Sequence, residues 1–180
     1  MLETLGSLLL IAAMIFIVIG LFYERRLKVA AVPTLPLIKR TIIQVINTHI
    51  KGKTQPKKIA ELGSGWGGIS FLMAKNFPQS CITGYEFFFA PYWVSKLLGM
   101  RCSNVDFHQK DLFEQPLGDY DVIVFYLTPK LTAMLKEKFD KELKPGTLVI
   151  SNAFPLPDID PVEIIETKTL AKIKIFVYRF

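Results

Sequence analysis

Residues 59–68 read Ile-Ala-Glu-Leu-Gly-Ser-Gly-Trp-Gly-Gly, a short apolar run that leads directly into a glycine-rich turn. In an open parallel sheet, a turn of this kind after the first strand lets the backbone approach a ligand that side chains would otherwise keep away. The stretch therefore predicts an α/β fold with a nucleotide-like cofactor at the carboxyl end of a strand.

The glycine pattern by itself fits two classes of cofactor. Gly63, Gly65 and Gly68 satisfy the dinucleotide fingerprint. Gly63, Gly65 and Gly67, preceded by Glu61, satisfy the pattern of S-adenosylmethionine (SAM) sites. A dinucleotide places its diphosphate near the amino end of the following helix, where Glu61 would repel it. SAM has no phosphate but carries an ammonium and a sulfonium, so the same carboxylate attracts it.

Two further acidic residues follow later apolar runs. Glu86 ends the run 81–86, where the ribose of either cofactor would be held, so it does not discriminate. Asp111 follows the run 104–109, and an acid there is the usual partner of the adenine amino group in SAM enzymes. Together these residues favour SAM over a dinucleotide. The cofactor-binding candidates are Glu61, Gly63, Ser64, Gly65, Gly67, Glu86, Asp111 and Leu112.

The amino-terminal region is strongly apolar. The 20 residues from 4 to 23 carry no charge, and as a helix they would span about 30 Å, the hydrocarbon thickness of a bilayer. The amino end offers Glu3 but no Lys or Arg, and no small-x-small cleavage site is evident, which favours an uncleaved transmembrane helix over a signal peptide. Because Arg25, Arg26 and Lys28 follow at once, we expect a single-pass membrane protein whose carboxyl-terminal part faces the cytoplasm.

The rest of the chain is long enough for one domain. We predict an anchor with a basic flank over residues 1–28 and a single domain over residues 29–180. The chain has 22 basic and 16 acidic residues, of which three basic and two acidic residues lie in residues 1–28. The domain therefore has 19 basic and 14 acidic residues, a formal charge of +5. This charge suits a face near anionic lipid, but it is too scattered for a nucleic-acid surface.

The cysteines and histidines argue against a disulfide and a metal. Cys81 lies in a predicted core strand and Cys102 in a loop, which indicates a reducing compartment. His49 and His108 lack companion ligands at metal spacing. We therefore expect no metal and no nucleic-acid partner.

Helix and strand patterns alternate along the domain. After a helix that begins beyond Pro33 and ends near Ile50, we expect strands over 58–62, 81–86, 104–109, 120–127 and 147–154, and helices over 67–77, 90–98 and 131–143. This alternation predicts parallel crossovers. Residues 162–167 and 172–180 are typical of a hairpin. The predicted fold is a Rossmann-like, mostly parallel sheet that ends in an antiparallel hairpin and is preceded by one transmembrane helix.

The chain resembles a known family, the small membrane-anchored class I protein-lysine methyltransferases of mitochondria and their prokaryotic relatives. Those enzymes methylate the ATP synthase c-subunit or the adenine nucleotide translocase. The resemblance covers most of the chain and rests on the apolar amino-terminal segment and on residues 32–36, 61–65, 84–86, 110–113, 120–125, 129 and 154–157. It implies a SAM-dependent enzyme that methylates a lysine of a membrane-associated protein, with the helix after Pro33 helping to enclose the cofactor.

Two stretches depart from the family pattern. At the turn, the family resembles Asp-x-Gly-Ser-Gly-Asp-Gly-Arg, whereas this chain has Trp66 in place of the second acid and Gly68 in place of the arginine. Trp66 would either stack over the methionine end of the cofactor or pack between helix and sheet. Residues 87–89, all phenylalanine, stand where the family has Leu-Asn, and they would either wall the cofactor or acceptor channel or serve packing.

Methyl transfer from a sulfonium is an in-line displacement, so the site mainly has to align the nucleophile in a water-poor pocket. A lysine amine has an ordinary pKa of about 10.4, and an apolar pocket lowers that pKa because it penalises the ammonium. The catalytic candidates are Tyr126, Thr128 and Pro129, in the loop after the fourth strand, where amino-methylating enzymes of this fold bind the acceptor. Tyr126 would orient the amine; its alternative role is that of a core tyrosine.

Other interpretations remain open. Glu61 could cap the following turn, and Asp111 could form a turn without touching the cofactor. The acceptor could be a quinone, a phospholipid head group or another small molecule instead of a protein lysine. Trp66 and Gly68 also leave room for a SAM-binding protein without catalytic activity.

Overall fold

The computed structural model describes residues 6, 14, 33–50 and 58–180. Apart from the isolated positions 6 and 14, the predicted transmembrane helix, its basic flank and the domain boundary at residue 28 lie outside the described residues. No helix within the described residues is long and apolar enough to cross a membrane.

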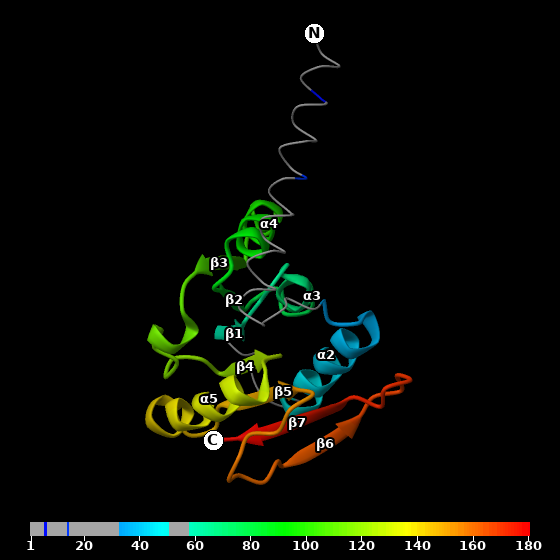
Figure 1. Ribbon diagram of the computed structural model, residues 1–180, viewed down its shortest axis with the longest axis vertical. Helices are drawn as coiled ribbons and strands as arrows, with labels where there is room; N and C mark the ends of the chain where they lie inside the picture. The colour runs from blue at the N-terminus through cyan, green and yellow to red at the C-terminus, as the bar shows by residue number, and fades with distance from the viewer. Residues whose placement is uncertain (1–5, 7–13, 15–32, 51–57) are drawn as a thin grey trace.

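In the described part of the chain, seven strands form one sheet in the order β3-β2-β1-β4-β5-β7-β6 (Figure 1). The strands are β1 (Lys58–Leu62), β2 (Cys81–Glu86), β3 (Val105–Gln109), β4 (Val122–Phe125), β5 (Leu148–Asn152), β6 (Glu163–Glu166) and β7 (Lys174–Arg179). Strands β1 to β5 pair in parallel, and β7 pairs antiparallel with both β5 and β6. The predicted parallel sheet with a carboxyl-terminal hairpin is confirmed.

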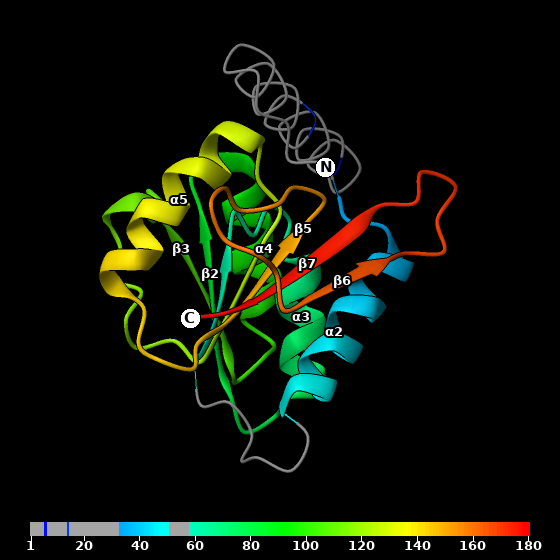
Figure 2. The ribbon, with the colours of Figure 1, turned by 90° about the horizontal axis from the view of Figure 1, so that it is seen from below.

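Helices cover both faces of the sheet (Figure 2). Helices α2 (Pro36–Ile50) and α3 (Gly68–Asn76) pack on one face, and α5 (Pro129–Glu142) packs on the other. Helix α4 (Phe89–Gly99) lies against β3 and β2, next to α3. A short 3-10 turn, η1 (Leu112–Glu114), follows β3.

Alternation along β1 decides which side chains face the site. Ile59 belongs to the core beneath α2 and α3, whereas Ala60 and Leu62 belong to the core beneath α5. Successive side chains of a strand point to opposite faces, so Glu61 lies on the α3 side. The carboxylate of Glu61 is thereby buried between β1 and α3.

The fourth and fifth strands are shorter than the sequence predicts. Strand β4 ends at Phe125, because the chain then turns toward Pro129, which begins α5. Strand β5 ends at Asn152, and the next residue, Ala153, adopts a left-handed φ of 74°. The residues that follow each strand are therefore loop residues free to line a site. Cys81 lies in its predicted strand, but its side chain is exposed.

Candidate functional site

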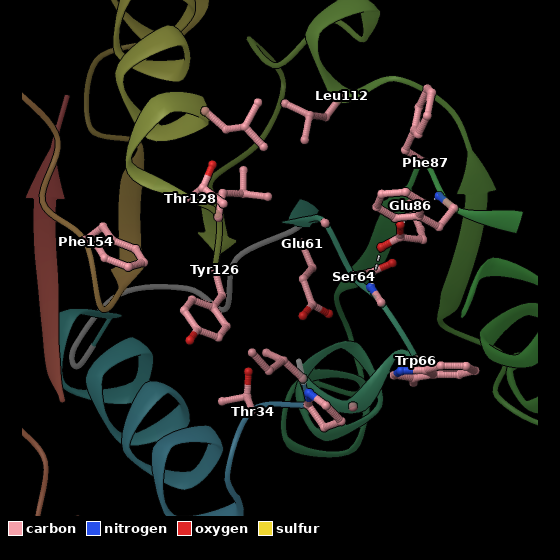
Figure 3. Close-up of a pocket in the computed structure, with 18 of the residues that line it drawn as sticks. Thr34, Glu61, Ser64, Trp66, Glu86, Phe87, Leu112, Tyr126, Thr128 and Phe154 are labelled. Atoms are coloured by element: carbon pink, nitrogen blue, oxygen red, sulfur yellow. Dashed lines mark hydrogen bonds between the residues drawn. The ribbon is translucent and has the colours of Figure 1, made fainter. Parts of the chain in front are cut away.

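A cavity of about 350 Å³ lies at the carboxyl ends of the central strands (Figure 3). Its walls come from the segment before α2, the glycine turn, the loop after β2, η1, the loop after β4 and the loop after β5. The lining residues are Pro33, Thr34, Lys39, Glu61, Gly63, Ser64, Gly65, Trp66, Gly68, Ile69, Glu86, Phe87, Phe88, Leu112, Tyr126, Leu127, Thr128, Pro129, Leu131 and Phe154.

The glycine turn brings backbone to the wall of this cavity. Gly63 has a φ of 74°, and a Cβ there would lie 2.8 Å from Cδ2 of Leu127. The hydroxyl of Ser64 is buried and has no hydrogen-bond partner among the described residues. A buried hydroxyl without a partner carries a desolvation cost that a polar ligand would relieve. The turn thus offers both the space and an unused hydrogen-bonding group for a ligand.

Gly67 has a different role from the other glycines of the turn. Its φ is 80°, and a Cβ there would meet the rings of Phe71 and Phe107 and the side chain of Ser95. It does not line the cavity. Gly67 therefore permits the close packing of α3 on α4 and β3, and its predicted contact with the cofactor stays a prediction.

Two backbone amides hold the carboxylate of Glu86 at the wall of the cavity. One carboxylate oxygen accepts a hydrogen bond from the amide of Gly65 at 2.7 Å, and the other accepts one from the amide of Phe88 at 2.8 Å. Each carboxylate oxygen can accept more than one hydrogen bond. Glu86 is therefore oriented to accept further hydrogen bonds from hydroxyl groups of a bound ligand.

Glu61 supports the first turn of α3 and also lines the cavity. One of its oxygens accepts a hydrogen bond from the amide of Ser70 at 2.8 Å, which satisfies a donor in the first turn of α3. The side chain also lines the cavity and extends between Tyr126 and Trp66 (Figure 3). Burial raises the pKa of Glu61 to about 8, against the opposing effects of the Ser70 hydrogen bonds and of the charge of Lys39.

Lys39 reaches the site from α2, and sequence reasoning missed it. A Cβ on Gly68 would collide with the Nζ atom of Lys39, so this ammonium occupies the space beside the position at which the resembled family carries arginine. Lys39 lies 29 positions before Gly68 in the sequence. In the sequence, the only sign of a basic group from elsewhere was the glycine at position 68 in place of the family's arginine, and it did not indicate which residue fills that space.

The acceptor candidates lie together in the loop after β4 and at the start of α5. Tyr126, Thr128 and Pro129 all line the cavity, and Phe154 enters it from the loop after β5 (Figure 3). Leu112, a cofactor candidate, also lines it. The side chains of Pro129, Phe154 and Leu112 make the cavity wall around the acceptor candidates mostly apolar.

Asp111 lies outside the cavity lining. One oxygen of its carboxylate accepts a hydrogen bond from the amide of Phe113 at 2.9 Å and caps η1. This is the turn-forming role that the sequence left as the alternative. A contact between Asp111 and an adenine amino group remains a prediction.

The aromatic departures from the family pattern divide between site and surface. Trp66, Phe87 and Phe88 line the cavity, so Trp66 does not pack into the core between helix and sheet. Phe89 instead begins α4 with 54% of its surface exposed. Within residues 33–50 and 58–180, the His, Cys, Asp and Glu side chains form no group of three or more that could hold a metal.

The sequence of the chain matches one protein family over residues 61–163, and that family is described as the ANTKMT methyltransferase domain. The chain belongs to this family. It is 33% identical over 135 residues to the adenine nucleotide translocase lysine N-methyltransferase of Mus musculus, covering 72% of this chain. The match spans 58% of that relative, less than two thirds of its length. A protein-lysine N-methyltransferase of Saccharolobus islandicus is 29% identical over 146 residues, 76% of this chain and 86% of the relative.

Solved structures confirm the fold of the ANTKMT methyltransferase domain. An RNA methyltransferase from Salinibacter ruber, bound to S-adenosyl-L-homocysteine, has a TM-score of 0.71 at 22% identity, over 82% of this chain and 93% of that chain. The plantazolicin methyltransferase BpumL reaches a TM-score of 0.57 at 18% identity, over 72% of this chain and 49% of that chain. The predicted family and the Rossmann-like methyltransferase fold are confirmed.

Proposed function

We propose that this chain transfers a methyl group from SAM to a lysine side chain of a membrane-associated protein. One observation carries the proposal: six of the eight cofactor candidates and all three acceptor candidates line one cavity. The glycine turn and Glu86 form one end, and Tyr126, Thr128 and Phe154 form the other. A methyl donor at the first end would face a nucleophile at the second.

The polar groups of the cofactor end fit the polar groups of SAM. Glu86 is oriented to accept hydrogen bonds from the ribose hydroxyls, and the unpartnered hydroxyl of Ser64 can bind a polar group of the ligand. The carboxylate of Glu61 would attract the ammonium of SAM, and the ammonium of Lys39 would attract the carboxylate of SAM. When bound, SAM supplies an electrophilic methyl group on its sulfonium.

The acceptor end suits a lysine that enters as a neutral amine. Its apolar walls, which include Leu127 and Phe154, disfavour an ammonium and so lower the pKa of an entering lysine. The Tyr126 side chain lines the same end, where its hydroxyl can accept a hydrogen bond from the amine and orient the lone pair toward the methyl group. These residues align and desolvate the nucleophile, and the reaction needs no separate nucleophilic side chain.

The membrane-associated acceptor and the location rest on the sequence and on the relatives. The uncharged run 4–23 with its basic flank suits a single-pass anchor that leaves the domain in the cytoplasm. The mouse relative is named for a translocase lysine and the Saccharolobus relative for protein lysine. Confining enzyme and acceptor to one membrane surface raises their effective concentration without any new contact.

A lipid or quinone acceptor is the second candidate, favoured by the apolar character of the acceptor end. The test is to incubate the purified full chain with methyl-labelled SAM and host membranes, then to separate protein from lipid. The proposal expects the label in protein, released as methyl-lysine on hydrolysis. Label in the lipid fraction would support the second candidate. SAM binding without transfer of label would support a non-catalytic protein.

A further inference from the structure

A row of exposed apolar side chains extends from the rim of the cavity along α4. Four of them lie at positions 89, 93, 97 and 100, a spacing that places them on one side of a helix. Phe87, in the loop before α4, lines the cavity and leads into the row. We call this row the α4 stripe; its residues and exposed fractions are Phe87 60%, Phe89 54%, Trp93 48%, Leu97 66% and Met100 78%.

Core packing does not account for the α4 stripe. The side of α4 that faces the sheet is formed by Ala90, Pro91, Ser95 and Gly99, which are buried. The ring of Trp93 contacts Phe89, with centroids 6.0 Å apart, and about half of each side chain stays exposed. Contiguous exposed apolar surface of this kind marks an interaction site.

The charges around the α4 stripe are basic. Residues 87–105 include Lys96 and Arg101 and no Asp or Glu. Lys96, within α4, pairs with Asp106 of the neighbouring strand, and Arg101, two positions after the end of α4, is exposed. Aromatic and Leu side chains on one side of a helix, with basic residues in or next to that helix, are typical of elements that lie in the interface of a bilayer. Anionic lipid would complement both the stripe and the formal +5 of residues 29–180.

The chain length upstream of the described domain also favours a bilayer. Pro33 and Phe87 line the same cavity, so the segment that leads into α2 and one end of the α4 stripe both border the site. The ten residues from Tyr23 to Pro33 reach at most about 36 Å. If the run 4–23 crosses the membrane, the rim of the cavity is held within that reach of the bilayer surface.

The geometry points to a second membrane contact: the α4 stripe lies in the lipid interface and holds the cavity rim beside the bilayer. This inference rests on the proposed membrane anchor, and it adds a surface and an orientation that the anchor alone does not fix. A tether by itself would let the domain rotate. A tether and an interfacial helix together would present the cavity to acceptors that emerge from the membrane.

The test uses the two tryptophans of the chain, Trp66 and Trp93. A Trp66→Phe variant of the full chain, with Trp93 as its single tryptophan, is reconstituted in vesicles of phosphatidylcholine and phosphatidylglycerol. Lipids brominated near the head of the acyl chain quench tryptophan within a few ångströms, and iodide quenches tryptophan from water. We expect the brominated lipids to reduce Trp93 emission about twofold or more and iodide to have little effect, as for a helix seated at the acyl boundary.

Substitutions provide the matched comparison. Leu97→Glu places a charge on the α4 stripe, and Met134→Glu places the same charge at an exposed apolar position of α5, on the other face of the sheet. Leu97→Glu should weaken the quenching of Trp93 by lipid, and Met134→Glu should leave it unchanged. Equal quenching in both variants would overturn the inference.

Every other outcome is also decisive. Quenching of Trp93 by iodide and not by lipid would show an exposed stripe and overturn the inference. Protection from both quenchers would show that protein, such as a second copy or another part of this chain, covers the stripe, and it would overturn the inference too. Flotation of the full chain with the vesicles is scored separately. A chain that floats without lipid quenching refutes the stripe contact alone, whereas a chain that does not float refutes the proposed anchor.

Discussion

At the cofactor end of the cavity, the backbone fixes the functional groups. Glu86 accepts hydrogen bonds from the amides of Gly65 and Phe88, and the amides of Gly63 and Ser64 donate to the carbonyl of Tyr85. At the acceptor end, the side chains stand on loops that follow the short strands β4 and β5. Hydrogen bonds among a few neighbouring elements hold the groups at the cofactor end. The groups at the acceptor end come from segments that are far apart in the sequence.

The difference implies that the two ends should fail in different ways. A change at the cofactor end breaks a hydrogen-bond framework or fills a space, so it should act on SAM binding. A change at the acceptor end alters the alignment of an incoming amine, so it should act on transfer. Four substitutions test this division, from the largest expected effect to the smallest.

Replacement of Gly63 should have the largest effect. In Gly63→Val, the Cβ would lie 2.8 Å from Leu127 and the φ of 74° would be strained. Overpacking of this kind costs about 1–3 kcal/mol and left-handed strain about 1–2 kcal/mol, so SAM affinity should fall by about 100-fold or more in calorimetry. Gly146→Val is the control, because its φ is 92° but nothing lies within 4 Å of the added Cβ. Unchanged affinity in Gly63→Val would contradict the turn as a SAM site.

Replacement of Glu86 should come next. Glu86→Ala removes the acceptor for two backbone amides and, in the proposed complex, for the ribose hydroxyls of SAM. Loss of charge-assisted hydrogen bonds costs about 1.5–3 kcal/mol, so SAM affinity should fall about 10- to 100-fold. The control is Glu163→Ala on β6, which removes a hydrogen bond to His49 of α2, away from the cavity. If both alanine variants bind SAM equally well, Glu86 does not hold the cofactor.

The raised pKa of Glu61, about 8, predicts a proton released on binding. Below that pKa the unligated protein holds a proton on Glu61, and the ammonium of SAM favours the carboxylate, so binding expels the proton. SAM affinity should therefore rise with pH between about 6 and 7.5, by up to about tenfold per unit. Calorimetry in buffers of different ionisation enthalpy should detect the proton with the wild type and not with Glu61→Gln. Identical enthalpies across buffers for the wild type would refute the linkage.

The same pKa predicts how stability depends on pH without SAM. As the pH rises, the unfolded chain loses the proton of Glu61 near its ordinary pKa of 4.5, whereas the folded protein keeps that proton up to about pH 8. The contribution of Glu61 is therefore fullest below pH 4.5 and is lost as the pH rises toward about 8. Urea unfolding at pH 6 and pH 8 should show a smaller decline in Glu61→Gln than in the wild type.

Replacement of Tyr126 should have the smallest effect. Tyr126→Phe removes one hydroxyl from the acceptor end, so single-turnover methyl transfer should slow by about five- to tenfold while SAM affinity stays within about twofold. The control is Tyr92→Phe on α4, a tyrosine that does not line the cavity. Weakened SAM binding with an unchanged rate of methyl transfer would contradict the assignment of Tyr126 to the acceptor end.

The sequence located the glycine turn and Glu86 from local patterns, although two other cofactor candidates, Gly67 and Asp111, do not line the cavity. Local chemistry specified the turn, because a carboxylate followed by positive-φ glycines needs no distant partner to be recognised. The position of Glu86 followed from its place at the end of the apolar run 81–86. Asp111 shows the limit of this reasoning: the same residue type at the same spacing suits a helix cap, and the hydrogen bond to Phe113 shows that it serves as one.

Long-range placement explains what the sequence could not predict. Lys39 enters the site because α2 packs beside α3, and no pattern near the turn indicates which helix lies there. The ends of β4 and β5 also depend on where the chain leaves the sheet for Pro129 and at Ala153. Apolar runs do not mark those points, so the predicted fourth strand extended to residue 127, past Phe125, where β4 ends.

The most direct test of a two-ended cavity is the steady-state formation of methyl-lysine on membrane protein, with SAM varied, for the wild type, Glu86→Ala and Tyr126→Phe. We predict that Glu86→Ala raises KM for SAM about tenfold or more with little change in kcat, whereas Tyr126→Phe lowers kcat with KM for SAM unchanged. Changes in the same constant for both variants, or wild-type label on a group other than lysine, would contradict this prediction.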